Sequence, residues 1–599
     1  MAAKSPHSNR LLGQITLCGA ILIVGYIGLF CILQAPPMWY SQRPDTVRSP
    51  FPDVFGPINA LFPMRWVMLD RDSLMAQIIT PLYLGVVALI TVPVFYLLRK
   101  LPKWRYIVQA DRKRLLLTIF GVTLLIMVIL MFVRGLLSSD IYSYFWYSRI
   151  WVDHGASPYT NFPREFALPA DPEGSIAWVF WQTEPSVYGP AWLYISGLFY
   201  KLGQWLGGSF SAQILSLKLL ADIAHLVNGF LVWSVMGLIL AKRPQQLAPP
   251  SLVRKLPRQA RPGTFYRPAQ KDHSTTLGLQ TAALLFYLWN PLLLVEFAAN
   301  GHNDVVMITF VLLALWLHLK GWWRFAALAL AVAALVKLPA LLFIPGYLWL
   351  LFWNGVRSSE GEPTTRRFAH GVWRGVQALA VILVTWAVLY MPVWEGARTL
   401  QAAVSGPANK MYTHSLPYVL WWNVPDLLTK LLHPGSGTSS VAFMAHVREF
   451  VDANVRMWFL CLFVLIAIAL TWRARTFSRT LIAWGFVVIA FIMAQGWFWP
   501  WYVSWVIPIA ALAPSRRLRI ATWIFSITSL LHYTNEQILQ RKFSFFLDWS
   551  GVLIMMPPLA YMLGSWLLEV QRTRQARLST VRAGQKQRSK AQTRPELAR

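Results

Sequence analysis

Apolar segments long enough to cross a bilayer recur along nearly the whole 599-residue chain. Hydrophobic residues make up 56% of the sequence and charged residues only 13%, a balance far from that of soluble domains. A helix needs about 20 apolar residues to span a hydrocarbon core of about 30 Å. We therefore expect an all-α polytopic integral membrane protein of about 14 transmembrane helices, with juxtamembrane helices and large outer loops.

The net charge of +30 raises the question of nucleic-acid binding. The basic residues, however, cluster in short segments between apolar runs, such as residues 99–114, and in the C-terminal tail. This is the positive-inside pattern, in which Lys and Arg mark cytoplasmic loops and face anionic lipid headgroups. The pattern predicts a lipid bilayer and no nucleic acid as the partner of these charges, with both termini in the cytoplasm.

The same rule gives an expected organisation for the chain. Residues 1–570 form a single transmembrane domain, and residues 571–599 a basic cytoplasmic tail without stable structure. Residues 188–206 are interrupted by Pro190 and Gly197, so we expect a juxtamembrane helix there. The segment 322–353 is broken by Pro339 and is expected to be a hairpin of two short helices. The large loops are then 35–74, 137–210 and 394–454 on the outer side, and the basic loop 242–272 inside.

Several kinds of chemistry find no support in the sequence. Cys18, Cys31 and Cys461 all lie in apolar runs, which favours neither disulfides nor a thiolate metal site. The chain lacks a GxxxxGK[ST] phosphate loop and an HExxH motif, which disfavours a nucleotide-driven pump or a metalloprotease.

Asp140 follows directly on an apolar helix and opens an aromatic-rich loop, residues 137–160. A partly desolvated carboxylate at a membrane boundary could act as a general base. It could equally be an N-cap for the segment that follows, and spacing alone does not decide between the two. The polar and aromatic residues that share this loop are Tyr142, Tyr144, Arg149, Asp153, His154 and Tyr159.

His302, Asn303 and Asp304 share a tight turn between two expected spans, on the same outer side as Asp140. Asn303 or Asp304 alone could simply cap the next helix. His302 could donate a hydrogen bond to a phosphate. For the three residues together, capping and function remain equally good accounts.

Lys337 lies deep in an apolar stretch, where a charged residue marks a substrate or ion path and could bind a phosphate. The alternative is snorkelling to the nearest headgroups. Lys218, Asp222 and His225 pose the same question, although a Lys–Asp pair spaced i, i+4 is a sufficient structural explanation. The remaining aromatic candidates could line a substrate path or form an interfacial belt: Tyr188, Tyr412, His414, Trp499, Trp501 and Tyr502.

Five motifs, in order, resemble those of one known family: SSDIYSYFWYSRIWVDHGASPYT, VYGPAW, NPLLLVEFAANGHNDVVM, ALVKLPALL and QGWFWPWY. They are similar to the polyprenol-phosphate-mannose-dependent α-1,6-mannosyltransferases of the integral-membrane GT-C superfamily, over roughly residues 115 to 515. The resemblance implies transfer of a hexose, mannose in this family, from a polyprenyl-phosphate sugar to a glycolipid or polysaccharide acceptor on the extracytoplasmic face of the cell membrane.

By the same resemblance Asp140 is the general base of a single inverting displacement. Arg149, His302, Asn303, Asp304 and Lys337 would bind the donor phosphate and sugar, and the aromatic residues, with Asp153 and His154, would line the substrate. Many superfamily members carry two acids together in this loop, often with a divalent ion. This chain has one acid after the two serines, so we expect no required metal or other cofactor, with Asp153 and Asp304 as the nearest candidate ligands.

Two alternatives remain open. A polyprenyl-phosphate-dependent transferase of another sugar fits the same motifs, because none of them reads the hydroxyl pattern of the sugar. A lipid or solute transporter would use the intramembrane charges, but its polar site should lie near the midplane. The densest set of polar residues in this chain is expected at one face, which favours the enzyme.

Overall fold

The structure is a computed structural model that describes residues 6–33, 74–101, 112–133, 136–167, 171, 174–246, 273–406, 411–432, 438–534 and 544–592. Within these residues there is no β-strand, and the only strand-like pairing is an isolated bridge between Thr413 and Trp497. The prediction of an all-α polytopic membrane protein is confirmed.

The helices follow one another with short connections over most of the described chain. Their bounds are α1 (Pro6–Ile32), α3 (Leu74–Lys100), α4 (Arg112–Met131), α5 (Asp140–Val152), α6 (Pro163–Phe166), α7 (Pro190–Trp205), α8 (Phe210–Gln246), α10 (His273–Leu288), α11 (Pro291–Leu293), α12 (Asp304–Leu319), α13 (Trp323–Val336), α14 (Ile344–Ser358), α15 (Thr364–Tyr390), α16 (Arg398–Ser405), α17 (Leu416–Leu432), α18 (Thr438–Arg473), α19 (Phe477–Ala494), α20 (Ile507–Leu512), α21 (Arg516–Leu530) and α22 (Ser544–Gln592). Shorter 3₁₀ segments are η4 (Ser175–Trp178), η6 (Leu338–Phe343), η7 (Met391–Val393) and η9 (Pro500–Trp505), and η5 (Leu294–Ala299) is a π-helical turn.

Nine helices of the described chain are long and apolar enough to cross a membrane, or ten if the bent pair 277–288 and 291–299 counts as one span. Three shorter apolar helices, α12, α13 and the segment Pro500–Leu512, have 10–17 residues each. Such short helices can cross only where neighbours bury them, and all three are rich in buried residues. The count of about 14 crossings stays a prediction.

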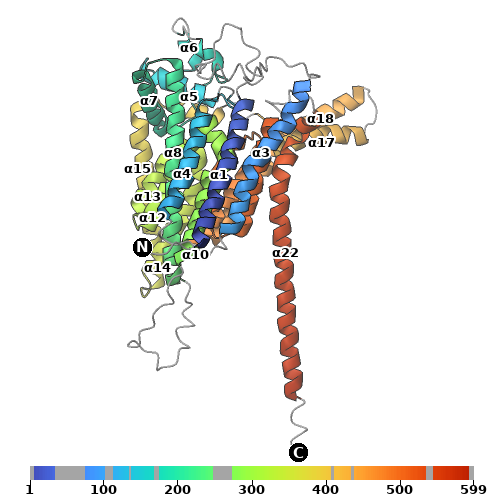
Figure 1. The fold of residues 1–599 in the computed structure, drawn as a ribbon. Coiled ribbons are helices and arrows are strands. Elements are labelled where there is room, and N and C mark those ends of the chain that lie inside the picture. Colours follow the sequence, from blue (N-terminus) through green and yellow to red (C-terminus); the bar gives the residue numbers. More distant parts are fainter. Residues whose placement is uncertain are drawn as a thin grey trace, which may run out of the picture.

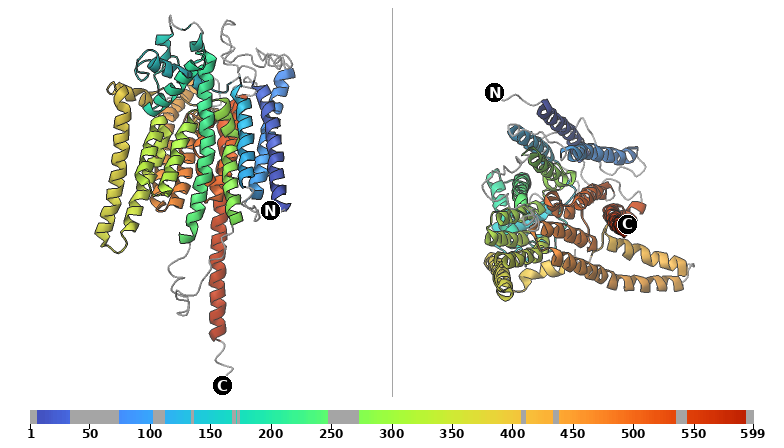
Figure 2. Two further views of the ribbon diagram at one scale, coloured as in Figure 1. Left: turned by 60° about the vertical axis from the view of Figure 1, so that its left-hand side comes forward. Right: turned by 90° about the horizontal axis from the view of Figure 1, so that it is seen from below.

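The helices pack side by side as one bundle (Figures 1 and 2). α8 runs along α7, α10 and α12, while α12 packs against α13 and α14 against α15. The core is dense with large side chains, including Trp146, Trp289 and Tyr287, none of which is exposed. This packing fixes the ends of the helices relative to one another.

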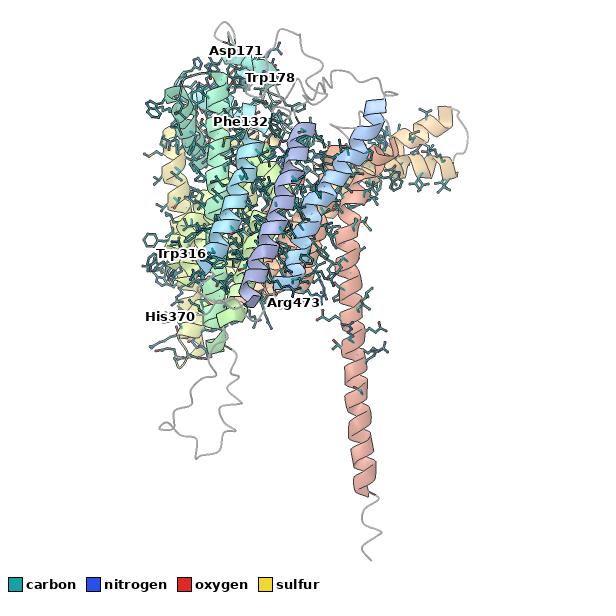
Figure 3. The ribbon with its side chains drawn as sticks, viewed as in Figure 1. Phe132, Asp171, Trp178, Trp316, His370 and Arg473 are labelled. Atoms are coloured by element: carbon teal, nitrogen blue, oxygen red, sulfur yellow. The ribbon has the colours of Figure 1, made fainter. Side chains whose placement is uncertain are left out.

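The two ends of the bundle differ in composition. Asp171 and Trp178 lie at the end that carries α5, α6 and α7, whereas His370 and Arg473 lie at the opposite end (Figure 3). α17 and the start of α18 reach sideways from the bundle near the first end, and α22 extends far beyond the second (Figure 1). The two ends of the bundle are therefore built from different segments of the chain.

Several segments have the form expected from the sequence. α7 fills most of residues 188–206 and is not among the helices long enough to span. α13 and α14 are separate helices with a break at residues 337–343, which contains Pro339. α22 differs from the expectation: it continues as a helix through Gln592, where the sequence suggests an unstructured tail from residue 571. Loop 394–454 contains α16, α17 and the start of α18. Residues 35–73 and 247–272 of the other expected loops lie outside the described residues.

Candidate functional site

α5 begins at Asp140 itself, so this residue is the first of the helix rather than its N-cap. Ser139 occupies the N-cap position and makes no capping hydrogen bond with its side chain. The Asp140 backbone N–H donates to Oγ of Ser138 at 3.3 Å. The carboxylate of Asp140 is thus not used to start α5 and is available for other contacts.

The Asp140 carboxylate meets side chains from distant parts of the sequence. The Tyr188 hydroxyl donates to Oδ2 at 3.5 Å, and Nδ1 of His302 lies 3.7 Å from the same oxygen. The side chain keeps 15% of its surface exposed. Burial raises the pKa of Asp140 from 3.8 to about 6, opposed by the positive charge of Lys337 and reinforced by the negative charge of Asp304. Asp140 is the one partly accessible acid of this group.

The turn 300–304 holds its polar side chains against α5. Gly301 has a φ of +74°, which favours glycine, and a Cβ there would lie 2.7 Å from Cδ1 at the end of the Ile141 side chain. Asn303 accepts a hydrogen bond from the Tyr144 hydroxyl at 3.1 Å. The turn is fully buried, and its neighbours therefore determine what it can bind.

Asp304 and Lys337 form a buried ion pair. Nζ of Lys337 donates to Oδ2 of Asp304 at 2.7 Å, and Nε1 of Trp505 donates to Oδ1 at 2.5 Å. Lys337 follows α13 in extended conformation, keeps 13% exposure and lies 5.8 Å from the centre of the Tyr188 ring. Its ammonium therefore points into the group around Asp140 rather than snorkelling away from it. We call Asp140, His302, Asn303, Asp304 and Lys337 the Asp140 cluster.

His302 is completely buried and links Asp140 to a second acid. Its ring stacks on Trp501 with the centroids 4.1 Å apart, and Nε2 lies 3.4 Å from a carboxylate oxygen of Glu296. Within the described residues neither ring nitrogen makes a hydrogen bond. Burial, with a smaller contribution from Lys337, lowers the pKa of His302 well below its ordinary value. The imidazole is therefore neutral at physiological pH.

Five residues that the sequence suggested have their contacts elsewhere. Arg149 lies 3.8 Å from Asp171 and over the ring of Trp146, while Asp153 accepts hydrogen bonds from Tyr200 and Gln204. Arg149 is in the second half of α5, roughly 13 Å further along the helix than Asp140, and Asp153 is the C-cap residue of that helix. Tyr142 packs on Trp178 and Phe210, His154 on Phe166, and Tyr159 beside Tyr390.

The aromatic residues of QGWFWPWY divide into two groups. Trp501 stacks on His302 and on Trp499, so it forms one wall of the cluster. Tyr502 stacks on Trp505, the residue that bonds Asp304. Trp499 contacts His532, which in turn meets His414, so a column of rings leads from the cluster towards the start of α17. Tyr412 lies beyond this column, stacked on Trp421.

Sequence reasoning overlooked three residues that complete the site. Glu296 contacts His302, Tyr533 donates to Glu296, and Trp505 donates to Asp304. Glu296 carried a usable signal, because a carboxylate within an apolar segment usually has a function. Trp505 and Tyr533 carried none, since one more aromatic residue in a membrane protein is unremarkable by sequence. Lys218, by contrast, donates to the carbonyls of Leu130 and Met131 at the end of α4, a structural role.

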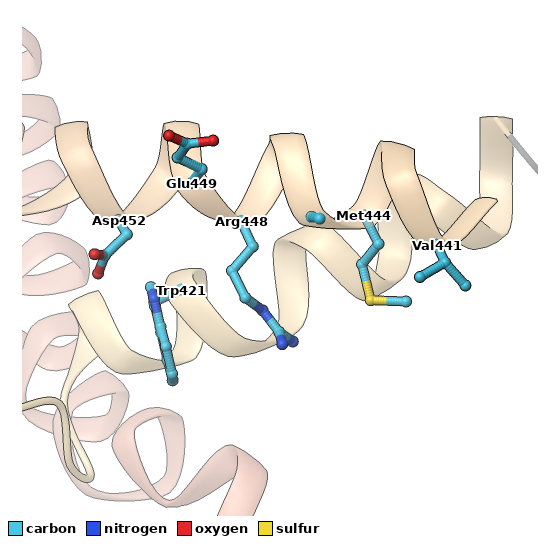
Figure 4. Close-up of a pocket in the computed structure, with 7 residues that line it drawn as sticks. Trp421, Val441, Met444, Arg448, Glu449 and Asp452 are labelled. Atoms are coloured by element: carbon cyan, nitrogen blue, oxygen red, sulfur yellow. The ribbon is translucent and has the colours of Figure 1, made fainter. Parts of the chain in front are cut away.

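The described residues contain no group of three or more His, Cys, Asp or Glu side chains suited to hold a metal ion. A cavity of about 500 Å³ lies between α17 and α18 (Figure 4). It is lined by Trp421, Val441, Met444, Ala445, Arg448, Glu449 and Asp452, none of which belongs to the Asp140 cluster. The clustered chemistry and this cavity are thus separate features of the molecule.

Two comparisons place this architecture among known proteins. Residues 57–245 and 274–353 match the family described as alpha-(1->6)-mannopyranosyltransferase, N-terminal domain. The curated Alpha-(1->6)-mannopyranosyltransferase A of Mycobacterium tuberculosis is 24% identical over 273 residues, which are 43% of this chain and 48% of that protein. The match therefore spans about half the length of this relative. No solved structure matches the chain.

The matched residues include Asp140, the turn 300–304 and Lys337, which come together in the structure. Over these residues the chain is similar to the alpha-(1->6)-mannopyranosyltransferase family.

Proposed function

We propose that this protein is a membrane mannosyltransferase that moves mannose, in α-1,6 linkage, from a polyprenyl-phosphate donor to a lipid-linked or glycan acceptor. One observation carries the proposal: Asp140 is the only partly exposed acid of a buried polar cluster at one end of the bundle, with a pKa raised to about 6. A general base is most effective when its pKa is near the working pH. The similarity to the alpha-(1->6)-mannopyranosyltransferase family supports the choice of sugar and linkage.

The chemistry is a single displacement with inversion. The acceptor hydroxyl loses its proton to Asp140 while its oxygen bonds to the anomeric carbon of mannose, and the bond from that carbon to the polyprenyl phosphate oxygen breaks. The departing phosphate gains negative charge. The ammonium of Lys337 is the cation that the Asp140 cluster offers to it. Stabilisation of that charge in the transition state would lower the barrier.

Lys337 can serve in this way because Asp304, itself bonded to Trp505, holds it in place. The Asp304 carboxylate accepts one hydrogen bond from Lys337 and one from Trp505, so its two oxygens are occupied and its charge is compensated. An ammonium has three N–H donors, and the bond to Asp304 uses only one. The partly exposed Tyr188 ring beside the cluster is suited to pack against the face of a sugar.

The proposed site faces the outside of the cell. Arg473, the basic residue that ends α18, lies at the end of the bundle opposite Asp171 (Figure 3). Basic connections mark the cytoplasmic side of membrane proteins. A polyprenyl-phosphate donor fits an outer site, where no nucleotide sugar is available, and the bilayer itself delivers the lipid-linked substrate.

The test is transfer of labelled mannose from a polyprenyl-phosphate donor in proteoliposomes. Asp140→Asn should abolish turnover and leave donor binding in place, because the amide cannot accept the proton. Asp426→Asn is the control, since that carboxylate pairs with Lys430 on the exposed face of α17. In the wild type the rate should fall as the pH drops through about 6, where Asp140 becomes protonated. Normal turnover of Asp140→Asn would rule out Asp140 as the base.

A further inference from the structure

Glu296 is a buried acid with no assigned role. It lies in the π-helical turn η5, and none of its surface is exposed. Its carboxylate accepts from the Tyr533 hydroxyl and from Nδ2 of Asn300 at 3.0 Å, and it faces Nε2 of His302 at 3.4 Å. Single π-turns occur often at functional sites, because the extra residue redirects a side chain. Within the described residues, Lys and Arg form no ion pair with Glu296.

Two connections tie Glu296 to the segment that carries Asp140. The amide of Asn300, which donates to Glu296, also accepts from the backbone N–H of Leu137 at 2.9 Å. The backbone N–H of His302 donates to the carbonyl of Glu296 at 3.1 Å. The imidazole thus lies between two acids, with Nε2 towards Glu296 and Nδ1 towards Asp140 at 3.7 Å.

We propose that Glu296 is a positioning residue for Asp140: its carboxylate, 3.4 Å from Nε2 of His302, favours the tautomer with the proton on Nε2 and leaves the lone pair of Nδ1 facing the Asp140 carboxyl. The inference rests on the proposed function insofar as Asp140 is the base of the reaction. Carboxylates orient neutral imidazoles in this way in metal sites and catalytic triads, and the hydrogen bond to one nitrogen fixes the state of the other.

The sign of the effect on Asp140 follows from this orientation. A lone pair on Nδ1 can accept a hydrogen bond only from protonated Asp140, so it favours the protonated form and strengthens Asp140 as a base. If Nδ1 carried the proton instead, it would donate to the Asp140 carboxylate, favour the ionised form and weaken the base. Glu296 would thereby select the stronger of two possible bases.

Other charged and titratable groups also face Asp140, and they stay constant in the comparison that tests Glu296. Lys337 and Asp304 act in opposite directions on its pKa, and the hydroxyls of Tyr188 and Tyr144 favour the ionised form. They belong to the end of α13, to α12, to the segment before α7 and to α5, and none of them touches Glu296 through a hydrogen bond in the described residues.

The experiment measures protonation of Asp140 without relying on turnover. A hydrophobic carbodiimide reacts with protonated carboxyls, and peptide mass spectrometry then gives the extent of labelling at Asp140 as a function of pH. In wild-type protein the midpoint should lie near pH 6. In Glu296→Gln the new amide can donate to Nε2, so the midpoint should fall by about one pH unit. In the transfer assay kcat should fall about 10-fold, with the KM for the donor unchanged.

Asp222→Asn is the matched control, because Asp222 is another buried acid of the bundle but lies near Lys218 rather than His302. It should leave the labelling midpoint of Asp140 where it is. His302→Gln removes the linking ring, so it should shift the midpoint by itself, and the double variant with Glu296→Gln should add nothing further. If Glu296→Gln does not fold, His302→Gln carries the test.

A wild-type midpoint in Glu296→Gln or in His302→Gln would overturn the proposal, as would an equal shift in Asp222→Asn. The labelling result is separate from the proposed function. A shifted midpoint together with an active Asp140→Asn variant would mean that Glu296 controls Asp140 but that Asp140 is not the base. An unshifted midpoint with an inactive Asp140→Asn would leave the function standing and remove Glu296 from it.

Discussion

The Asp140 cluster lies near the same end of the bundle as α17 and the start of α18, which we call the α17–α18 hairpin. The two regions differ in how they are built. The cluster joins side chains from α5, the turn before α12, α12 and the end of α13, and Trp505 of η9 bonds to it. In the hairpin, Leu427 and Phe450 are each more than half exposed, and only 6% of the most apolar part of α18 is buried. Contacts within the hairpin come from two neighbouring helices.

This difference predicts how each region responds to change. Residues that share a buried network couple strongly, so the loss of one partner leaves another unsatisfied. Exposed pairs and surface contacts contribute little and add independently. Substitutions in the cluster should therefore have large and non-additive effects, and substitutions in the hairpin small and additive ones.

The largest effect is expected from the ion pair of Asp304 and Lys337. Asp304→Asn leaves the ammonium without its carboxylate and should lower the free energy of unfolding by about 3 kcal/mol, the range for a broken buried pair. Adding Lys337→Gln should restore most of the stability but not transfer. Denaturation in detergent measures the first quantity. Lys430→Gln, in the exposed pair with Asp426, is the control and should cost less than about 0.5 kcal/mol. Equal losses at the two pairs would contradict the comparison.

The next effect concerns Asp140 and depends on pH. Its pKa rises from 3.8 to about 6 on folding, so ionisation opposes folding: the stability contribution is present below pH 3.8 and is lost as the pH rises through about 6. Asp140→Asn should therefore be more stable than wild type by up to about 3 kcal/mol above pH 6, with the gain shrinking towards pH 4. Thermal unfolding at pH 4 and pH 7 tests this. A gain in stability that does not depend on pH would argue against a carboxylate whose ionisation burial disfavours.

A smaller effect is expected at Gly301, where the turn meets α5. Gly301→Ala places a methyl group 2.7 Å from the end of the Ile141 side chain and imposes a left-handed backbone on alanine. We expect a loss of about 1–2 kcal/mol in unfolding free energy and reduced transfer. Gly155→Ala has a similar φ of +64° with open space around it, so it isolates the backbone contribution. Identical losses in the two variants would mean that the contact with Ile141 is unimportant.

The smallest effect should come from the hairpin. The Arg448 guanidinium lies over the rings of Trp421 and Trp422 at 5.8 and 5.5 Å, beside the cavity between α17 and α18. Arg448→Gln should lower stability by about 0.5–1 kcal/mol, the size of an exposed cation–π contact, and change transfer less than threefold. A loss of transfer comparable to that of Asp304→Asn would place the hairpin in the site and remove the contrast between the two regions.

Much of the site was predictable because its residues are unusual for their surroundings. Asp140 and the turn 300–304 are polar groups at the borders of apolar segments, and Lys337 lies deep within one; a bilayer makes such groups costly unless they have partners. The break at Pro339 was also predictable, since proline lacks the N–H donor that a helix interior requires. Arg149 and Asp153 met the same criterion, yet they contact Asp171 and Tyr200.

The sequence by itself determined the helical class, the approximate positions of the spans and the end of the bundle where polar residues gather, because hydrophobic length and charge placement act locally along the chain. Only the tertiary structure decided which polar groups meet. It paired Lys337 with Asp304 and stacked His302 on Trp501. It also placed Glu296 against His302, with Tyr533 donating to Glu296. These partners are far apart in sequence, and their contact depends on how the helices pack, which no local pattern records.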